Sequence, residues 1–121
     1  MKKLNNTLLA INELEAIEES ILYLRNRHQV FCVILFGSKA RGDYDEHSDI
    51  DLLIVTLKKL NNREETNILN NLFDIGIKYN VIFSPLNVAL SEWNNGIFTE
   101  FYIYNEIMKD GILCYESTSN H

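Results

Sequence analysis

Two carboxylates stand two residues apart where an apolar segment begins. Asp49 and Asp51 flank Ile50 at the start of IDLLIVT, residues 50–56. In a β-strand, residues i and i+2 point to the same side, so these two carboxylates would project together. Like charges that close resist joint ionisation unless a cation lies between them. Mg²⁺ takes oxygen ligands and often shares them with substrate phosphates, although an isolated Asp-x-Asp is more commonly a turn cap beside a solvent-facing acid.

A glycine–serine pair ten residues earlier changes this interpretation. Gly37 and Ser38 follow the apolar run VFCVILF, residues 30–36, and precede Lys39-Ala40-Arg41. Glycine lets a backbone approach a phosphate closely, and the first amides of a helix attract anions. The Ser38 hydroxyl can add a hydrogen bond, and the Arg41 guanidinium can contact phosphate oxygens through several donors. Together the turn and the acid pair predict a site for a magnesium ion and a phosphate group.

The surrounding pattern predicts elements that would position these residues. The runs at 30–36 and 50–56 are rich in β-branched and aromatic residues and indicate buried strands. Residues 80–88 predict a third strand, which lies at a sheet edge or carries a bulge because Pro85 lacks an amide donor, and residues 111–116 predict a short further strand. Helical spacing of apolar residues predicts helices over 7–27, 61–79 and 97–109. We therefore expect an α/β fold, a small mixed β-sheet flanked by helices, in a single domain of residues 1–121.

The helix expectations include specific inward faces. In the helix over 61–79 we expect seven residues to face the core, and in the helix over 97–109 we expect four packing residues before a glycine cap. The residues expected to face the core in 61–79 are Ile68, Leu69, Leu72, Phe73, Ile75, Gly76 and Ile77. The packing residues expected in 97–109 are Phe98, Phe101, Tyr102 and Met108, and the expected cap is Gly111.

The motif resembles a known family. The segment G37-S38-KARGDYDEHS-D49-I50-D51 is similar to the nucleotidyltransferase superfamily of DNA polymerase beta type, and its Ala40-Arg41-Gly42 and Ser48 resemble the minimal nucleotidyltransferases, or MNT proteins. The resemblance implies the polymerase beta-like fold and transfer of AMP from ATP. It implies that Gly37, Ser38 and Arg41 bind the nucleotide, and that Asp49 and Asp51 are catalytic and bind Mg²⁺.

The sequence departs from that family at one position. The family pattern includes a third carboxylate on a later strand beside the Asp-x-Asp strand. The expected strand at 80–88 carries no acid, and its polar groups include Ser84 and Asn87. Asp74, in a predicted helix, and Glu92, beyond the strand, are poor substitutes. Catalysis with a base from the acceptor, or nucleotide binding without turnover, are both compatible with this departure.

The amino-acid composition limits the classes of partner and the cellular compartment that we expect for this chain. The 121 residues carry 17 acidic and 11 basic side chains, a net charge of −6, which opposes binding to a nucleic-acid backbone. No apolar run is long enough to span a membrane, and the acidic N-terminal region lacks a signal core, so we expect a cytoplasmic protein. Cys32 and Cys114 lie far apart in apolar runs and indicate reduced core thiols.

Three functions follow from the resemblance. MNT proteins often pair with an all-helical HEPN toxin, so the first is an antitoxin that transfers AMP to a HEPN-type partner, as part of a hetero-oligomer. The second is a nucleotide-binding module that neutralises its partner by contact alone, which the missing carboxylate favours. The third is transfer to a small molecule such as an aminoglycoside antibiotic, although such enzymes usually carry an additional helical domain.

Overall fold

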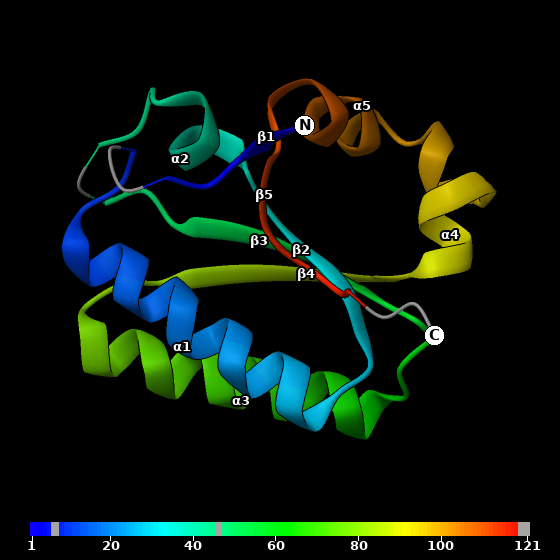
Figure 1. Cartoon of the computed structure of the whole chain (residues 1–121), viewed down its shortest axis with the longest axis horizontal. Helices are drawn as coiled ribbons and strands as arrows, with labels where there is room; N and C mark the ends of the chain where they lie inside the picture. The colour runs from blue at the N-terminus through cyan, green and yellow to red at the C-terminus, as the bar shows by residue number, and fades with distance from the viewer. Residues whose placement is uncertain (6–7, 46, 119–121) are drawn as a thin grey trace.

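A mixed five-stranded sheet forms the centre of the molecule in the computed structural model, which describes residues 1–5, 8–45 and 47–118 (Figure 1). The strand order is β1-β5-β2-β3-β4. The strands are β1 (Lys2–Lys3), β2 (Val30–Phe36), β3 (Ile50–Thr56), β4 (Phe83–Ala89) and β5 (Ile112–Glu116). The expected α/β fold with a small mixed sheet is therefore confirmed.

Helices cover both faces of this sheet. They are α1 (Ile11–Arg27), α2 (Gly37–Arg41), α3 (Asn62–Tyr79), α4 (Leu90–Asn95) and α5 (Tyr102–Asp110), with a 3₁₀ turn η1 (Ile97–Glu100). Helices α1 and α3 lie side by side on one face, whereas α4 and α5 lie on the other (Figure 1). The short helix α2 leads out of β2 and contacts α5.

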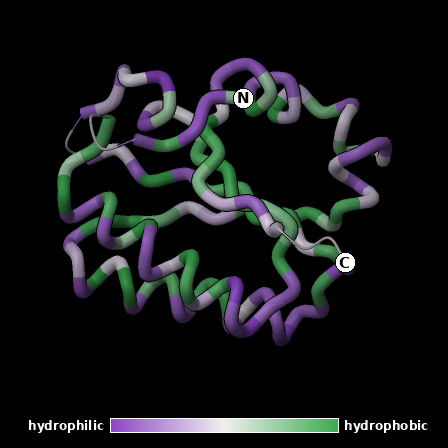
Figure 2. Tube along the Cα trace, in the orientation of Figure 1, coloured by the Kyte–Doolittle hydropathy of each residue, from purple (hydrophilic) through white to green (hydrophobic). Residues whose placement is uncertain are grey.

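The alternation of side chains along β2 and β3 divides the core in two. Leu52 and Ile54 pack with Ile17 and Leu72 from the α1–α3 layer. Leu53 and Val55, one residue out of phase, pack with apolar side chains from η1 and α5. Hydrophobic residues accordingly line the central strands (Figure 2). Because strand positions alternate, Asp51 belongs to the same face as Leu53, the face that carries α4 and α5.

Strand β4 lies at the edge of the sheet, as its proline predicted. It pairs in parallel with β3, and Pro85 lies opposite Leu52. The predicted start at residue 80 was wrong because Asn80 ends α3 in the left-handed conformation, with φ 59°. The amide of Val81 then donates to the carbonyl of Gly76 at 2.9 Å, a helix-terminating bond, so the strand begins at Phe83.

The expected inward face of α3 was wrong for three residues. Ile68, Leu72, Ile75 and Gly76 are buried. Leu69 is 52 % exposed, Phe73 66 % and Ile77 67 %. These three are spaced by four residues and form one stripe beside the buried face, because α3 contacts the sheet and α1 over only part of its circumference. The number of apolar residues in α3 therefore gave too wide an estimate of the side of the helix that faces the core.

The single helix expected at 97–109 is two shorter elements. The 3₁₀ turn η1 ends at Glu100, and α5 begins at Tyr102 after an extended Phe101. Phe98 is buried as expected, but Phe101, Tyr102 and Met108 are exposed. Gly111 does cap α5, since its amide donates to the carbonyl of Ile107 at 2.7 Å.

The N-terminal region also differs from the expectation. Helix α1 begins at Ile11, and residues 8–10 are not helical, because the Glu13 carboxylate accepts the Ala10 amide at 2.8 Å and fixes the first turn there. The predicted start at residue 7 lies outside the described residues. Ile11, the first residue of the helix, is exposed although it is apolar. The sequence did not indicate β1, a two-residue strand parallel to β5.

Two further expectations concern the cysteines and the membrane. Both cysteines are free thiols, and burial raises the pKa of each to about 12, as expected for core residues. Within the described part of the chain, no helix has the length and apolarity to cross a membrane.

Candidate active site

The glycine–serine turn and the acid pair meet at the end of β2. Strands β2 and β3 are antiparallel, and Phe36 lies opposite Asp51. Gly37 therefore follows directly beside Asp51, with a positive φ of 74°. A Cβ on residue 37 would lie 2.1 Å from Oδ2 of Asp51, so no other residue fits without displacing that carboxylate. The structure thus brings these two predicted site residues into contact distance.

Asp51 occupies an unfavourable position for a negative charge. Burial raises the pKa of its carboxyl, and the nearby charge of Asp49 raises it further. The charge of Arg41 acts in the opposite direction and lowers it. A divalent cation would relieve the repulsion between the two carboxylates, and two acids on one strand face supply the oxygen ligands that Mg²⁺ uses. The side chains present therefore fit a bound magnesium ion.

Asp49 is held by the neighbouring strand. Ser84 of β4 lies opposite Asp51 in the parallel register. Its hydroxyl donates to Oδ2 of Asp49 at 2.7 Å. Since a carboxylate offers several lone pairs, this bond fixes the side chain and leaves further oxygen sites for a ligand. Sequence reasoning named Ser84 but did not predict this bond, which depends on the register of β3 and β4.

Arg41 ends α2 at the border of the site. Its Nε donates to Oδ2 of Asp43 at 3.1 Å, and its Nη1 lies 4.0 Å from Oε1 of Glu106 on α5. These partners raise the pKa of its guanidinium, with the Asp43 hydrogen bond as the largest cause. The side chain is partly exposed, so a phosphate could replace Asp43 with little loss of stability. Ser38 lies half-buried in the first turn of the same helix.

The third carboxylate is missing from the expected strand. Ser84 occupies the position beside the acid pair, and Asn87 points to the other end of β3, where its amide donates to the carbonyl of Ile54 at 2.9 Å. Glu92 lies in α4 and Asp74 in α3. Among the residues that the structure describes, no group of three or more histidine, cysteine or acidic side chains could hold a metal ion.

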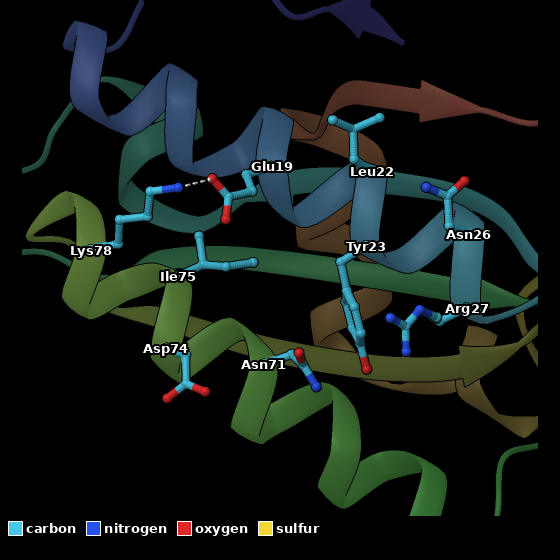
Figure 3. Close-up of a pocket in the computed structure, with 9 residues that line it drawn as sticks. All are labelled: Glu19, Leu22, Tyr23, Asn26, Arg27, Asn71, Asp74, Ile75 and Lys78. Atoms are coloured by element: carbon cyan, nitrogen blue, oxygen red, sulfur yellow. Dashed lines mark hydrogen bonds and ion pairs between the residues drawn. The ribbon is translucent and has the colours of Figure 1, made fainter.

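Asp74 lines a separate groove on the far side of the sheet. This groove of about 440 Å³ lies between α1 and α3 (Figure 3). Glu19 and Lys78 form an ion pair of 2.8 Å across it. Its charged groups have mixed signs, and α1 and α3 cover the sheet face opposite to Asp51. The groove is therefore not continuous with the candidate site.

Lys39 was not identified from the sequence as a residue of interest. The first residue after Gly37-Ser38 is buried, with Nζ 2.5 Å from Oε2 of Glu13 and 3.9 Å from the ring centroid of Tyr44. The only feature of the sequence that could have pointed to Lys39 was its position directly after Gly37-Ser38 in the motif. Glu13 lies 26 residues away in the chain, and no local pattern indicates such a pair.

Comparison with known proteins places the chain in a family. The model of the polymerase beta nucleotidyltransferase family matches residues 18–120. The chain belongs to this family. A protein of Methanocaldococcus jannaschii, provisionally named a protein adenylyltransferase, is 44 % identical over 54 residues, 45 % of this chain and 54 % of that protein. The chain thus spans about half the length of the relatives that it matches in sequence.

Solved structures share the fold at low sequence identity. A toxin–antitoxin complex with AMP-PNP contains a chain that is 14 % identical, with a TM-score of 0.60 over 87 % of this chain and 74 % of that one. A complex of an AMP-modified HEPN toxin from Shewanella oneidensis with its MNT antitoxin contains a chain that is 16 % identical, with a TM-score of 0.54 over 88 % and 74 %. These matches confirm the polymerase beta-like fold.

Proposed function

We propose that this nucleotidyltransferase family member transfers AMP from ATP to a partner protein, with Mg²⁺, in the cytoplasm. The observation that carries the proposal is the contact of Gly37 with Asp51 at the end of β2. This proximity supports the proposal, because a magnesium–nucleotide complex needs carboxylate oxygens for the metal and backbone amides for the phosphates at one location. The two thiols, which are free rather than paired, are compatible with a reducing compartment.

The residues have separate tasks in this proposal. The amides of Gly37 and Ser38 and the guanidinium of Arg41 bind the phosphates. Asp49 and Asp51 hold Mg²⁺, which when bound neutralises phosphate charge. An acceptor hydroxyl oxygen bonds to the α-phosphorus, the bond from that phosphorus to the oxygen bridging to the β-phosphate breaks, and pyrophosphate leaves with the electron pair. Because Ser84 is a poor base, the hydroxyl proton passes to a base of the acceptor protein or to water.

The acceptor that we propose is a HEPN-type toxin, which makes this chain an antitoxin. Similar solved chains occur in toxin–antitoxin complexes, one with AMP-PNP and one with an AMP-modified HEPN toxin. A relative is provisionally named a protein adenylyltransferase. The negative net charge argues against a nucleic-acid acceptor. The partner would supply the acceptor surface in a hetero-oligomer.

The test is transfer of label from ATP carrying ³²P at the α-phosphate. The purified chain is incubated with Mg²⁺ and the protein that the neighbouring gene encodes. We expect label on that protein, and we expect Asp49→Asn and Asp51→Asn to abolish it. Asp74→Asn is the matched control, since it removes an exposed carboxylate on the far face. Transfer that survives both site substitutions would refute the assignment.

Ser84 favours a second function, neutralisation of the partner by binding alone. A hydroxyl in place of a carboxylate removes a metal ligand and a base from β4. This function would be established if the chain formed a stable complex with the toxin, the toxin lost its activity in that complex, and no labelled AMP were transferred to it.

A further inference from the structure

A buried lysine lies next to the phosphate-binding turn. Lys39 follows Gly37-Ser38 directly and is 3 % exposed. Lysine is almost never fully buried unless its charge is paired. Its position in the middle of α2 therefore needs a structural reason, and the contacts of its ammonium group provide one.

The Lys39 ammonium connects α2 to the start of α1. Nζ lies 2.5 Å from Oε2 of Glu13 and 3.9 Å from the centroid of the Tyr44 ring. The charge is thus paired with a carboxylate and faces an aromatic ring, two contacts that strengthen when they are shielded from water.

Both partners of Lys39 are themselves fixed to the residues before α1. The second carboxylate oxygen of Glu13 accepts the Ala10 amide at 2.8 Å. The Tyr44 hydroxyl donates to the carbonyl of Leu8 at 3.1 Å. Residues 8–13 therefore hold the turn-bearing helix through Lys39 and the loop before Asp49 through Tyr44. In the described part of the chain, every buried side-chain nitrogen and oxygen has a partner.

Helix α2 cannot hold its own orientation. It has five residues, and an isolated helix of that length is unstable in water. Lys39 is its buried side chain, whereas Gly37, Ser38 and Arg41 are at least partly exposed. Helix α2 also contacts β2, β3 and α5, but the pair with Glu13 is the charged contact that holds its buried side chain, so the direction of the phosphate-binding groups depends in part on this pair.

We propose that Glu13 and Lys39 are positioning residues for nucleotide binding. Through the buried ion pair they hold the amides of Gly37 and Ser38, and the start of Arg41, in the direction that a triphosphate requires. This inference rests on the proposed function of the site. A misplacement of about 1 Å is enough to lower the rate of an enzyme by about a hundredfold, so loss of the pair should be visible in binding.

The experiment measures the dissociation constant of ATP with Mg²⁺ by calorimetry, well below each unfolding temperature. We expect Glu13→Gln to weaken binding about tenfold or more, because the amide keeps the acceptor for Ala10 but leaves Lys39 unpaired. Glu19→Gln is the matched control, since Glu19 lies on the same helix as Glu13 and forms an exposed ion pair with Lys78 of α3. The control should bind ATP as tightly as the parent.

A double variant separates positioning from stability. Glu13→Gln with Lys39→Met removes both charges and should recover much of the unfolding temperature that Glu13→Gln loses. We expect its ATP affinity to stay low, because α2 has lost its attachment to α1. Affinity equal to that of the parent in Glu13→Gln, or affinity that recovers together with stability in the double variant, would overturn the inference.

Hydrogen exchange tests the same inference without ATP. In Glu13→Gln, amides of residues 37–45 should exchange faster than in the parent, while those of residues 68–76 in α3 are unchanged. Unchanged exchange at 37–45, or equally faster exchange in both segments, contradicts a positioning role. If the parent does not bind ATP with Mg²⁺, the proposed function fails, and the exchange measurement still decides whether Glu13 fixes α2.

Discussion

At the scale of single residues, the two carboxylates of the candidate site repel each other. Asp51 is partly buried beside Asp49, and both burial and that neighbouring charge raise the pKa of its carboxyl. A raised pKa in the folded state means that the ionised carboxylate destabilises the fold at neutral pH. Sites that bind cations are commonly destabilising when empty, since the bound ion compensates the charge of the carboxylates.

We therefore predict that Asp51→Asn raises the unfolding temperature in chelator at pH 7, because the substitution removes the partly buried charge. The difference should be full above the folded-state pKa of Asp51. It should shrink as pH falls through the folded-state pKa and disappear only below the unfolded value, about 4, where the carboxyl is neutral in both states. Thermal denaturation of both proteins between pH 4 and 7 measures this, and a variant less stable than the parent at pH 7 would contradict the account.

At the scale of elements, the register of β3 and β4 decides what lies beside the acids. The parallel pairing places Ser84 opposite Asp51, and a shift by one residue would place Phe83 or Pro85 there instead. Helix α3 covers the other face of the same sheet through a narrow apolar side, which leaves Leu69 outside the core.

The two leucines of α3 provide a matched test of this packing. Leu72 is 1 % exposed, so Leu72→Ala should lower the free energy of unfolding by about 2–5 kcal/mol, through lost burial and a cavity. Leu69→Ala, at a half-exposed position of the same helix, should cost under about 1 kcal/mol. Urea denaturation of both variants measures the difference, and equal costs would show that the assigned face of α3 is wrong.

At the scale of the whole molecule, the charge balance opposes an anionic ligand. The chain carries −6, and the acid pair lies at the candidate site, so free ATP should be repelled. A divalent cation reverses the local sign and makes the same carboxylates favourable for phosphate binding.

We predict that ATP raises the unfolding temperature only when Mg²⁺ is present. A ligand at a hundred times its dissociation constant stabilises the fold by about 2.7 kcal/mol, which thermal denaturation detects readily. ATP in excess chelator should produce no shift, and ATP with Mg²⁺ should produce none in Asp49→Asn. A rise of equal size with and without Mg²⁺ would show that nucleotide binding does not depend on the metal.

The sequence by itself determined the two central strands β2 and β3, the motif and the family resemblance, because these depend on local information. Buried strands need consecutive apolar residues, and a phosphate-binding turn needs glycine at a fixed spacing from its acids. Gly37, Asp49 and Asp51 could therefore be named before any coordinates, and so could the edge position of β4 from Pro85.

Only the tertiary structure decided the contacts between segments that are distant in the chain. The bond from Ser84 to Asp49 depends on strand register, and the pairing of Lys39 with Glu13 depends on where the first turn of α1 lies relative to α2. The exposure of Leu69, Phe73 and Ile77 depends on how much of α3 its neighbours cover. Hydropathy shows that a residue favours burial, but the packing of the other elements determines whether a surface is there to bury it.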